Sequence, residues 1–81
     1  MRINSDENID LVMKANEVIL ELFGVEQAPN ASPLFLKNRT LTISCLNSTI
    51  AQEINLRQEE IVNKINDKLG KKEVDRIRYL L

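Results

Sequence analysis

The most informative segment of the chain begins with Leu34-Phe35-Leu36, continues through a polar turn at Lys37 to Thr40, and ends with Leu41-Thr42-Ile43-Ser44-Cys45. Apolar and β-branched residues on both sides of a short polar segment are typical of a β-hairpin. The hairpin is therefore the first element that the sequence predicts, and the rest of the chain is interpreted around it.

The side chains of this hairpin separate into two faces. A turn centred on Asn38-Arg39 places Leu36 opposite Leu41 and Leu34 opposite Ile43 on one face, and Phe35 opposite Thr42 and Lys37 opposite Thr40 on the other. We expect the first face to line the core and the second to be open. Arginine is poorly suited to the left-handed conformation of a two-residue turn, so we expect a wider loop.

A helix and a last strand follow the hairpin. Asn47 or a Thr49-x-x-Gln52 capping box can begin the helix, which ends at Leu69-Gly70. An unbroken helix from residue 48 to 69 would be about 33 Å long, whereas a five-residue strand spans about 17 Å, so we expect a break near Asn55 to Gln58. Residues 74–79 then alternate as a strand, which a helical crossover pairs in parallel with the second strand.

The N-terminal part is expected to contribute one helix to a single domain. Residues 1–7 are polar and are expected to be flexible, with the domain spanning residues 8–81. We expect a helix from residue 9 to Gly24, where the glycine would end it. Six apolar residues in this range follow helical spacing, namely Ile9, Val12, Met13, Ile19, Leu20 and Phe23. Two prolines and no periodicity predict a linker without regular structure over residues 25–33. The predicted order is α-β-β-α-β, an α+β fold with helices on one face of a three-stranded mixed sheet.

Composition excludes most catalytic chemistry. The 81 residues contain no histidine, only two glycines and one cysteine, so no histidine-based catalytic or metal site and no glycine-rich phosphate loop is available. Cys45 alternates with Leu41 and Ile43 and is expected to be a small core residue. We expect no enzymatic activity, no metal and no cofactor. With no apolar run long enough to cross a bilayer and no secretory leader, we expect a cytoplasmic protein.

Charge is distributed unevenly along a chain whose net charge is −1. Residues 1–31 carry two basic and six acidic side chains, whereas residues 57–81 carry seven basic and five acidic ones. The basic excess therefore lies in the hairpin and the C-terminal part, where an anionic partner could bind.

The sequence resembles the DciA family over residues 22–79. The segments that carry this resemblance are Thr40-Leu41-Thr42-Ile43, Asn47-Ser48-Thr49-x-Ala51-Gln52-Glu53-Ile54, Ile61-x-x-Lys64-Ile65-Asn66-x-x-Leu69-Gly70 and Val74-x-x-Ile77-Arg78-Tyr79. These bacterial proteins have a type II KH-like domain and are associated with loading the DnaB replicative helicase. The resemblance implies a KH-like fold, with the replicative helicase as a partner. RNA-binding KH domains use a Gly-x-x-Gly loop, which the corresponding Asn55-Leu56-Arg57-Gln58 lacks.

Two surfaces are candidates for binding nucleic acid or a partner. The open sheet face should present Phe35, Lys37, Thr42, Ser44, Arg76 and Arg78, a combination that could contact phosphates and stack a base. Lys71 and Lys72 lie past the helix stop, and Arg39 lies in the hairpin turn. The site residues predicted from the sequence are therefore Phe35, Lys37, Arg39, Lys71, Lys72, Arg76 and Arg78.

The sequence thus predicts a non-enzymatic DciA-like module that binds DNA, the replicative helicase, or both, in bacterial DNA replication. The nearly neutral net charge predicts weak, salt-sensitive binding to DNA. Two alternatives stay open at this point. One is a protein–protein adaptor that uses the sheet face or the acidic first helix, and the other is a general RNA-binding KH-like protein.

Overall fold

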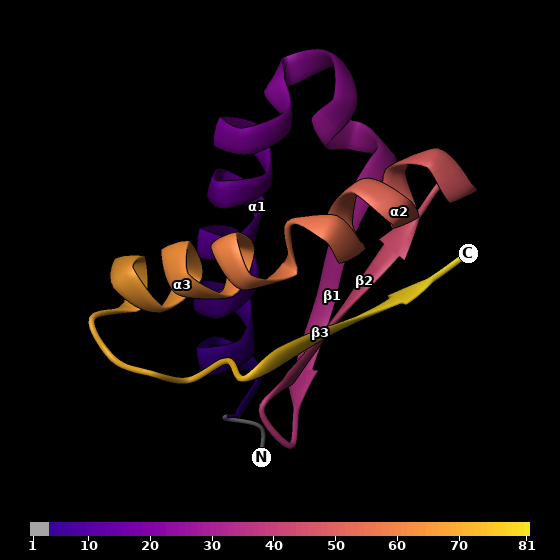
Figure 1. Cartoon of the computed structure of the whole chain (residues 1–81). Helices are drawn as coiled ribbons and strands as arrows, with labels where there is room; N and C mark the ends of the chain where they lie inside the picture. The colour runs from indigo at the N-terminus through magenta and orange to yellow at the C-terminus, as the bar shows by residue number, and fades with distance from the viewer. Residues whose placement is uncertain (1–3) are drawn as a thin grey trace.

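The computed structural model describes residues 4–81 and has a three-stranded sheet with helices packed on one face (Figure 1). The elements in chain order are α1 (Asn4–Gln27), a 3-10 helix η1 (Ala28–Asn30), β1 (Ala31–Lys37), β2 (Thr40–Cys45), α2 (Ser48–Leu56), α3 (Gln58–Leu69) and β3 (Arg76–Leu80). The sheet order is β1-β2-β3, with β1 antiparallel and β3 parallel to β2. The predicted α+β class and mixed sheet are confirmed.

The hairpin turn is tighter than the sequence predicts. Asn38 and Arg39 have φ angles of 52° and 62°, as the two central residues of a type I′ turn require. The expectation of a wider loop is therefore wrong. The tight turn is explained by contacts of Arg39 with the segment before β3, which are described below.

A bulge in β1 changes one of the four predicted hairpin pairs. Leu36 lies opposite Leu41 and Phe35 opposite Thr42, as predicted, but Ile43 is paired with Pro33 rather than with Leu34. The register shifts between Pro33 and Phe35, which leaves Leu34 as the extra residue of the bulge, 44% exposed.

The same strand overturns part of the predicted linker. β1 begins at Ala31, and η1 and the end of α1 occupy residues 25–30, so residues 25–33 are mostly in regular structure. Proline is tolerated at position 33 because β1 is an edge strand, where a missing N–H group need not break a ladder. Gly24 does interrupt α1 with a φ of 84°, but helical backbone resumes after it.

The core-facing side of α1 agrees only in part with the one that helical spacing predicts. Of the predicted residues, Ile19 is buried and Phe23 packs against the core, but Ile9, Met13 and Leu20 are 55%, 57% and 45% exposed. The other buried residues of α1 are Leu11, Ala15 and Val18, which were not predicted. The helix has two apolar sides, and periodicity alone does not say which one faces the sheet. Residues 1–3 lie outside the described residues and α1 begins at Asn4, so a flexible segment over residues 1–7 stays a prediction.

The predicted break in the second helical segment is confirmed at Arg57. The Asn47 side chain caps α2 by accepting a hydrogen bond from the Ile50 N–H at 3.0 Å. Arg57 separates α2 from α3, and its guanidinium lies 5.4 Å from the Phe23 ring and donates to the Leu22 carbonyl at 3.2 Å. Gly70 ends α3 in the left-handed conformation, with a φ of 77°.

One hydrophobic core connects the sheet to all three helices. Its fully buried side chains include Leu41 and Ile43 of β2, Ile54 of α2, and Ile61 and Ile65 of α3. Cys45 belongs to this core, and burial raises the pKa of its thiol, as expected for a core residue rather than a reactive cysteine. This core covers one face of the sheet, so the strand positions that point to the other face are fixed by the register.

Candidate nucleic-acid interface

The open sheet face carries two rows of side chains that cross all three strands. Pairing of β1 with β2 and of β2 with β3 aligns Lys37, Thr40 and Arg76 in one row, and Phe35, Thr42 and Arg78 in the next. Neighbouring strands lie about 4.8 Å apart, and the rows are about 7 Å apart along the strands. Side chains alternate between faces, so both rows point away from the helices that cover Leu41, Ile43 and Ile77.

The middle of this face is closely covered by its own side chains. Thr42 is only 5% exposed, because it lies between Phe35 and Arg78 on the central strand. Phe35 is itself 44% exposed, so the ring keeps an accessible surface beside a cation. An exposed aromatic ring flanked by arginine and lysine can stack a base while the cations contact phosphates.

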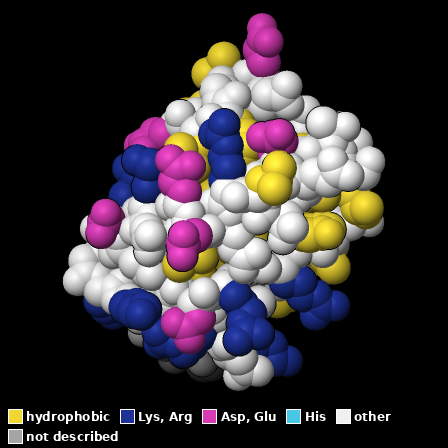
Figure 2. Space-filling model, viewed as in Figure 1, with side chains coloured by type: hydrophobic (Ala, Val, Ile, Leu, Met, Phe, Trp, Pro, Cys, Tyr) yellow, Lys and Arg dark blue, Asp and Glu magenta, His cyan; other side chains and the backbone are white. Residues whose placement is uncertain are grey.

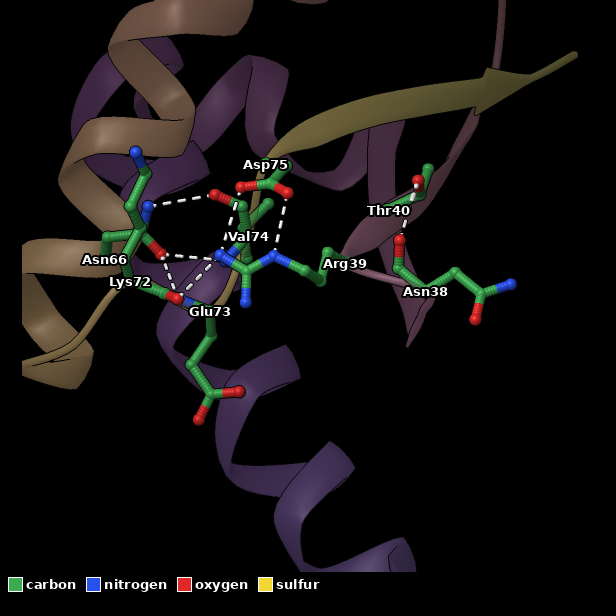
Figure 3. A network of polar contacts seen from close by, with 8 residues as sticks. All are labelled: Asn38, Arg39, Thr40, Asn66, Lys72, Glu73, Val74 and Asp75. Carbon is green, nitrogen blue, oxygen red and sulfur yellow. Dashed lines mark hydrogen bonds and ion pairs between the residues drawn. The ribbon is translucent and has the colours of Figure 1, made fainter.

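Arg39 lies at the hairpin end of this face, where it holds the segment that leads into β3 (Figure 3). Its Nε and Nη2 donate to Asp75 Oδ2 and Oδ1 at 2.7 and 3.0 Å, and Nη2 also donates to the Lys72 carbonyl at 2.9 Å. Its own carbonyl accepts the Asp75 N–H at 2.8 Å. The hydrogen bonds and charge of Arg39 lower the pKa of Asp75, and Lys72 and Arg76 add to this effect. Arg39 thus links the hairpin turn to the segment before β3.

A residue that sequence reasoning missed, Asn66, fixes the loop between α3 and β3. Its Oδ1 accepts the Glu73 and Val74 N–H groups at 3.0 and 2.9 Å, and its Nδ2 donates to the Val74 carbonyl at 3.0 Å (Figure 3). The available signal was an asparagine in the last turn of a helix that ends at a glycine, where side-chain amides often satisfy loop backbone groups.

The two lysines of this loop are exposed and lie close to carboxylates. Lys71 Nζ lies 2.9 Å from Glu73 Oε2, and Lys72 contributes to the electrostatic environment of Asp75. A hollow between α3 and the loop is lined by Asn63, Asn66, Asp67, Gly70, Lys71 and Lys72. Its neutral amides and paired charges make it a weaker site for an anion than the open sheet face.

A groove lies where a KH domain would carry its glycine loop. It has a volume of about 650 Å³ and runs between the α2–α3 break and the start of β3, with Lys72 and Arg76 on one side and Glu59 and Asp75 among the lining residues. The absence of glycine at the break, predicted from the sequence, leaves Leu56 and Arg57 side chains there. Two carboxylates in the lining make this groove less suited to phosphate than the two rows on the sheet.

The structure brings the predicted cations together at one end of the molecule. Six basic side chains lie on the hairpin, the α3–β3 loop and β3, namely Lys37, Arg39, Lys71, Lys72, Arg76 and Arg78, and two acidic ones lie among them, Glu73 and Asp75. This is a local excess of four positive charges in a chain of net charge −1. Lys and Arg side chains gather along the lower part of the view in Figure 2, over these elements. We call these six residues the basic end.

The comparison with protein families identifies the chain. Residues 13–79 match the family model described as Dna[CI] antecedent, DciA, which covers most of the chain and every predicted site residue. The chain belongs to the DciA family. No curated protein sequence matches it significantly.

Membership of the DciA family has direct consequences for function. DciA is a family of helicase loaders and not a catalytic family, so membership suggests a role in loading the replicative helicase in bacterial replication. Within residues 4–81, no helix has the length and apolar character needed to cross a membrane.

Proposed function

We propose that this DciA domain is a non-enzymatic, KH-like module that binds DNA through its open sheet face and basic end, and that also binds the replicative helicase. One observation carries the DNA part of the proposal. The register aligns Lys37 with Arg76 through Thr40, and Phe35 with Arg78 through Thr42, so that one aromatic ring and three cations share the open face of the sheet. Family membership supports the helicase part.

The charge distribution favours a nucleic acid over an acidic protein surface as the ligand of this face. Arg76 and Arg78 are exposed and form no ion pair with any described residue, so binding a phosphate would displace no partner from them. Neutralising phosphates releases counterions, which makes binding strongly salt-dependent. A protein adaptor that uses the same face would show weaker salt dependence, because its interface would also bury apolar surface.

The first prediction concerns these two arginines. Arg76→Ala/Arg78→Ala should bind DNA about tenfold or more weakly at low salt, and each lost contact should reduce the slope of log K against log salt by about 0.7 on single strands. The measurement is fluorescence anisotropy of labelled single-stranded, duplex and forked DNA, and of RNA of the same sequence, at several salt concentrations.

A matched control removes the same charge elsewhere. Lys14→Ala/Lys64→Ala lowers the net charge by two but lies on α1 and α3, so it should have little effect on the affinity. If both double variants lost the same affinity for DNA, the effect would be explained by net charge alone and not by the position of the arginines. An unchanged affinity in Arg76→Ala/Arg78→Ala would remove the sheet face from the proposal, and a preference for RNA would favour the general RNA-binding alternative.

A further inference from the structure

Helix α1 carries a second apolar stripe that the fold does not use. The core-facing residues Leu11, Ala15, Val18 and Leu22 are spaced 4, 3 and 4 residues apart, and so are Ile9, Met13, Asn16 and Leu20. At 100° per residue the two stripes lie about 160° apart around the helix. We call the second stripe, Ile9, Met13, Asn16 and Leu20, the outer seam.

The outer seam is accessible along its length. Its three large apolar side chains, Ile9, Met13 and Leu20, are 55%, 57% and 45% exposed. Because the opposite side of α1 packs against the sheet and α3, the seam faces away from the core. A helix that is apolar on two opposite sides is typical of a helix packed between two layers, and the described residues supply only one of them.

The spacing of the seam matches what another helix would contact. Residues spaced 4-3-4 form the single line of knobs that packs along a facing helix, as in coiled coils. Asn16 lies in the middle of the line, where a polar residue sets the register of such a pair. An extended strand would instead need edge hydrogen bonds, which a helix does not offer.

The charges beside the seam indicate what kind of helix fits. Between Ile9 and the end of α1 there are four carboxylates, Asp10, Glu17, Glu21 and Glu26, and one lysine, Lys14. Glu17 and Glu21 lie on the side that faces α3, where Lys68 Nζ binds them at 3.4 and 2.8 Å. Lys68, with the nearby Lys64, offsets these charges only in part, because both carboxylates stay about half exposed, and Asp10 forms no ion pair with a described residue. The border of the seam therefore stays acidic.

This border argues against a second copy of the chain as the occupant. A two-fold antiparallel pair of α1 helices would bring the same border of each helix together, so Glu17 and its acidic neighbours would face like charges. A helix from another protein, with its apolar line bordered by lysine or arginine, meets the seam with opposite charges.

We propose that the outer seam of α1 is a docking surface for an amphipathic helix of a partner protein whose apolar line has a basic border. This inference rests on the proposed function in one respect, since it names the surface through which the helicase would bind. The core-facing side of α1 packs against β1 and α3, so the seam points away from the sheet. Docking at the seam therefore leaves the nucleic-acid face accessible.

The test replaces two seam residues without changing the charge. Met13→Gln/Leu20→Gln keeps good helix formers at exposed positions, and the melting temperature should stay within a few degrees of the native value. The matched control is Leu46→Gln/Leu56→Gln, which changes two leucines outside the seam that are 74% and 78% exposed. The probes are two designed helical peptides with a 4-3-4 leucine line, one bordered by lysine and one by glutamate, and the purified replicative helicase.

The expected result is that the native domain binds the lysine-bordered peptide about tenfold more tightly than the glutamate-bordered one, and that Met13→Gln/Leu20→Gln loses about tenfold in affinity for it and for the helicase. The control variant should bind both like the native domain. Anisotropy with DNA, measured in parallel, should be the same for all three proteins.

Three results would separate the possible failures. Equal binding of both peptides and of the helicase to the native and seam variants would overturn the seam proposal while leaving DNA binding intact. A native dimer that the seam variant converts to a monomer would assign the seam to a second copy and also overturn it. Selective peptide binding without helicase binding would support the seam and reject the helicase as the partner.

Discussion

Arg39 has a backbone conformation that is rare for an arginine, and its side chain explains why it is tolerated. A φ of 62° is unfavourable for a residue with a Cβ atom. From this turn, its guanidinium donates two hydrogen bonds to Asp75 and one to the Lys72 carbonyl. The bidentate pair is half exposed, so solvent screens it, but its planar geometry still defines the position of the turn.

Replacing Asp75 should therefore make stability depend less on pH. The pKa of Asp75 is lowered from its ordinary value of 3.8, so its charged form stabilises the fold above that pH, and this stabilisation is lost as the pH falls through the folded-state pKa. We expect Asp75→Asn to melt at a lower temperature than the native domain at neutral pH and to converge with it at strongly acidic pH. Thermal melts across this range measure the difference.

Glu73→Gln is the control for this measurement. It removes a neighbouring carboxylate that contacts Lys71 but leaves the Arg39 pair intact. A difference between Asp75→Asn and the native domain that stays constant as the pH is lowered would show that the ion pair is not the cause.

Among the secondary-structure elements, the position of β3 depends on side-chain hydrogen bonds as well as on its backbone hydrogen bonds to β2. Asn66 fixes the preceding loop to α3 with three hydrogen bonds, and the Gln58 Oε1 accepts the Ile77 N–H at 3.0 Å. Both residues lie on α3, one near each end of the helix. The helix thus sets where β3 begins, and with it the positions of Arg76 and Arg78.

Asn66→Ala should lower the free energy of unfolding by about 2 kcal/mol, because it leaves two half-buried N–H groups without an acceptor. Asn66→Asp keeps the acceptor oxygen and should cost less. Urea unfolding followed by circular dichroism measures both, with the exposed Asn63→Ala, one turn earlier, as the control. A loss in Asn66→Ala no larger than in Asn63→Ala would contradict the role given to this side chain.

At the scale of the whole molecule, charge and apolar surface are separated. The basic end has an excess of four positive charges, and the remaining residues have five basic and ten acidic side chains. Exposed apolar side chains on α1 lie on the side of that helix that points away from the sheet. One domain can therefore present a surface for an anion and a surface for a protein without overlap.

We expect DNA and the replicative helicase to bind this domain at the same time. Titrating helicase into the domain bound to a labelled oligonucleotide too short for the helicase to hold should raise the anisotropy further. Arg76→Ala/Arg78→Ala should weaken binding of the oligonucleotide, and Met13→Gln/Leu20→Gln should weaken only the later binding of the helicase. Release of the oligonucleotide by helicase would mean that the two surfaces overlap.

Most of the fold and the arrangement of the open face could be predicted because they depend on local patterns. Alternation in the hairpin and in β3, together with the glycine after α3, was sufficient to predict the parallel pairing and the exposure of Arg76 and Arg78. The core-facing side of α1 could not be predicted, since the helix has two stripes with the same spacing. The bulge at Leu34 also escaped prediction, because regular alternation does not signal an extra residue.

Periodicity and residues with strong local preferences were enough to predict the class of fold, the break between α2 and α3, and the side chains of the sheet face. The turn at Arg39, the role of Asn66 and the outer seam of α1 became apparent only in the folded molecule. The first two depend on contacts between segments far apart in the chain, such as Arg39 with Asp75. The third depends on which of the two apolar sides of α1 packs against the core. Local sequence patterns do not specify long-range contacts or the choice between two similar helix sides.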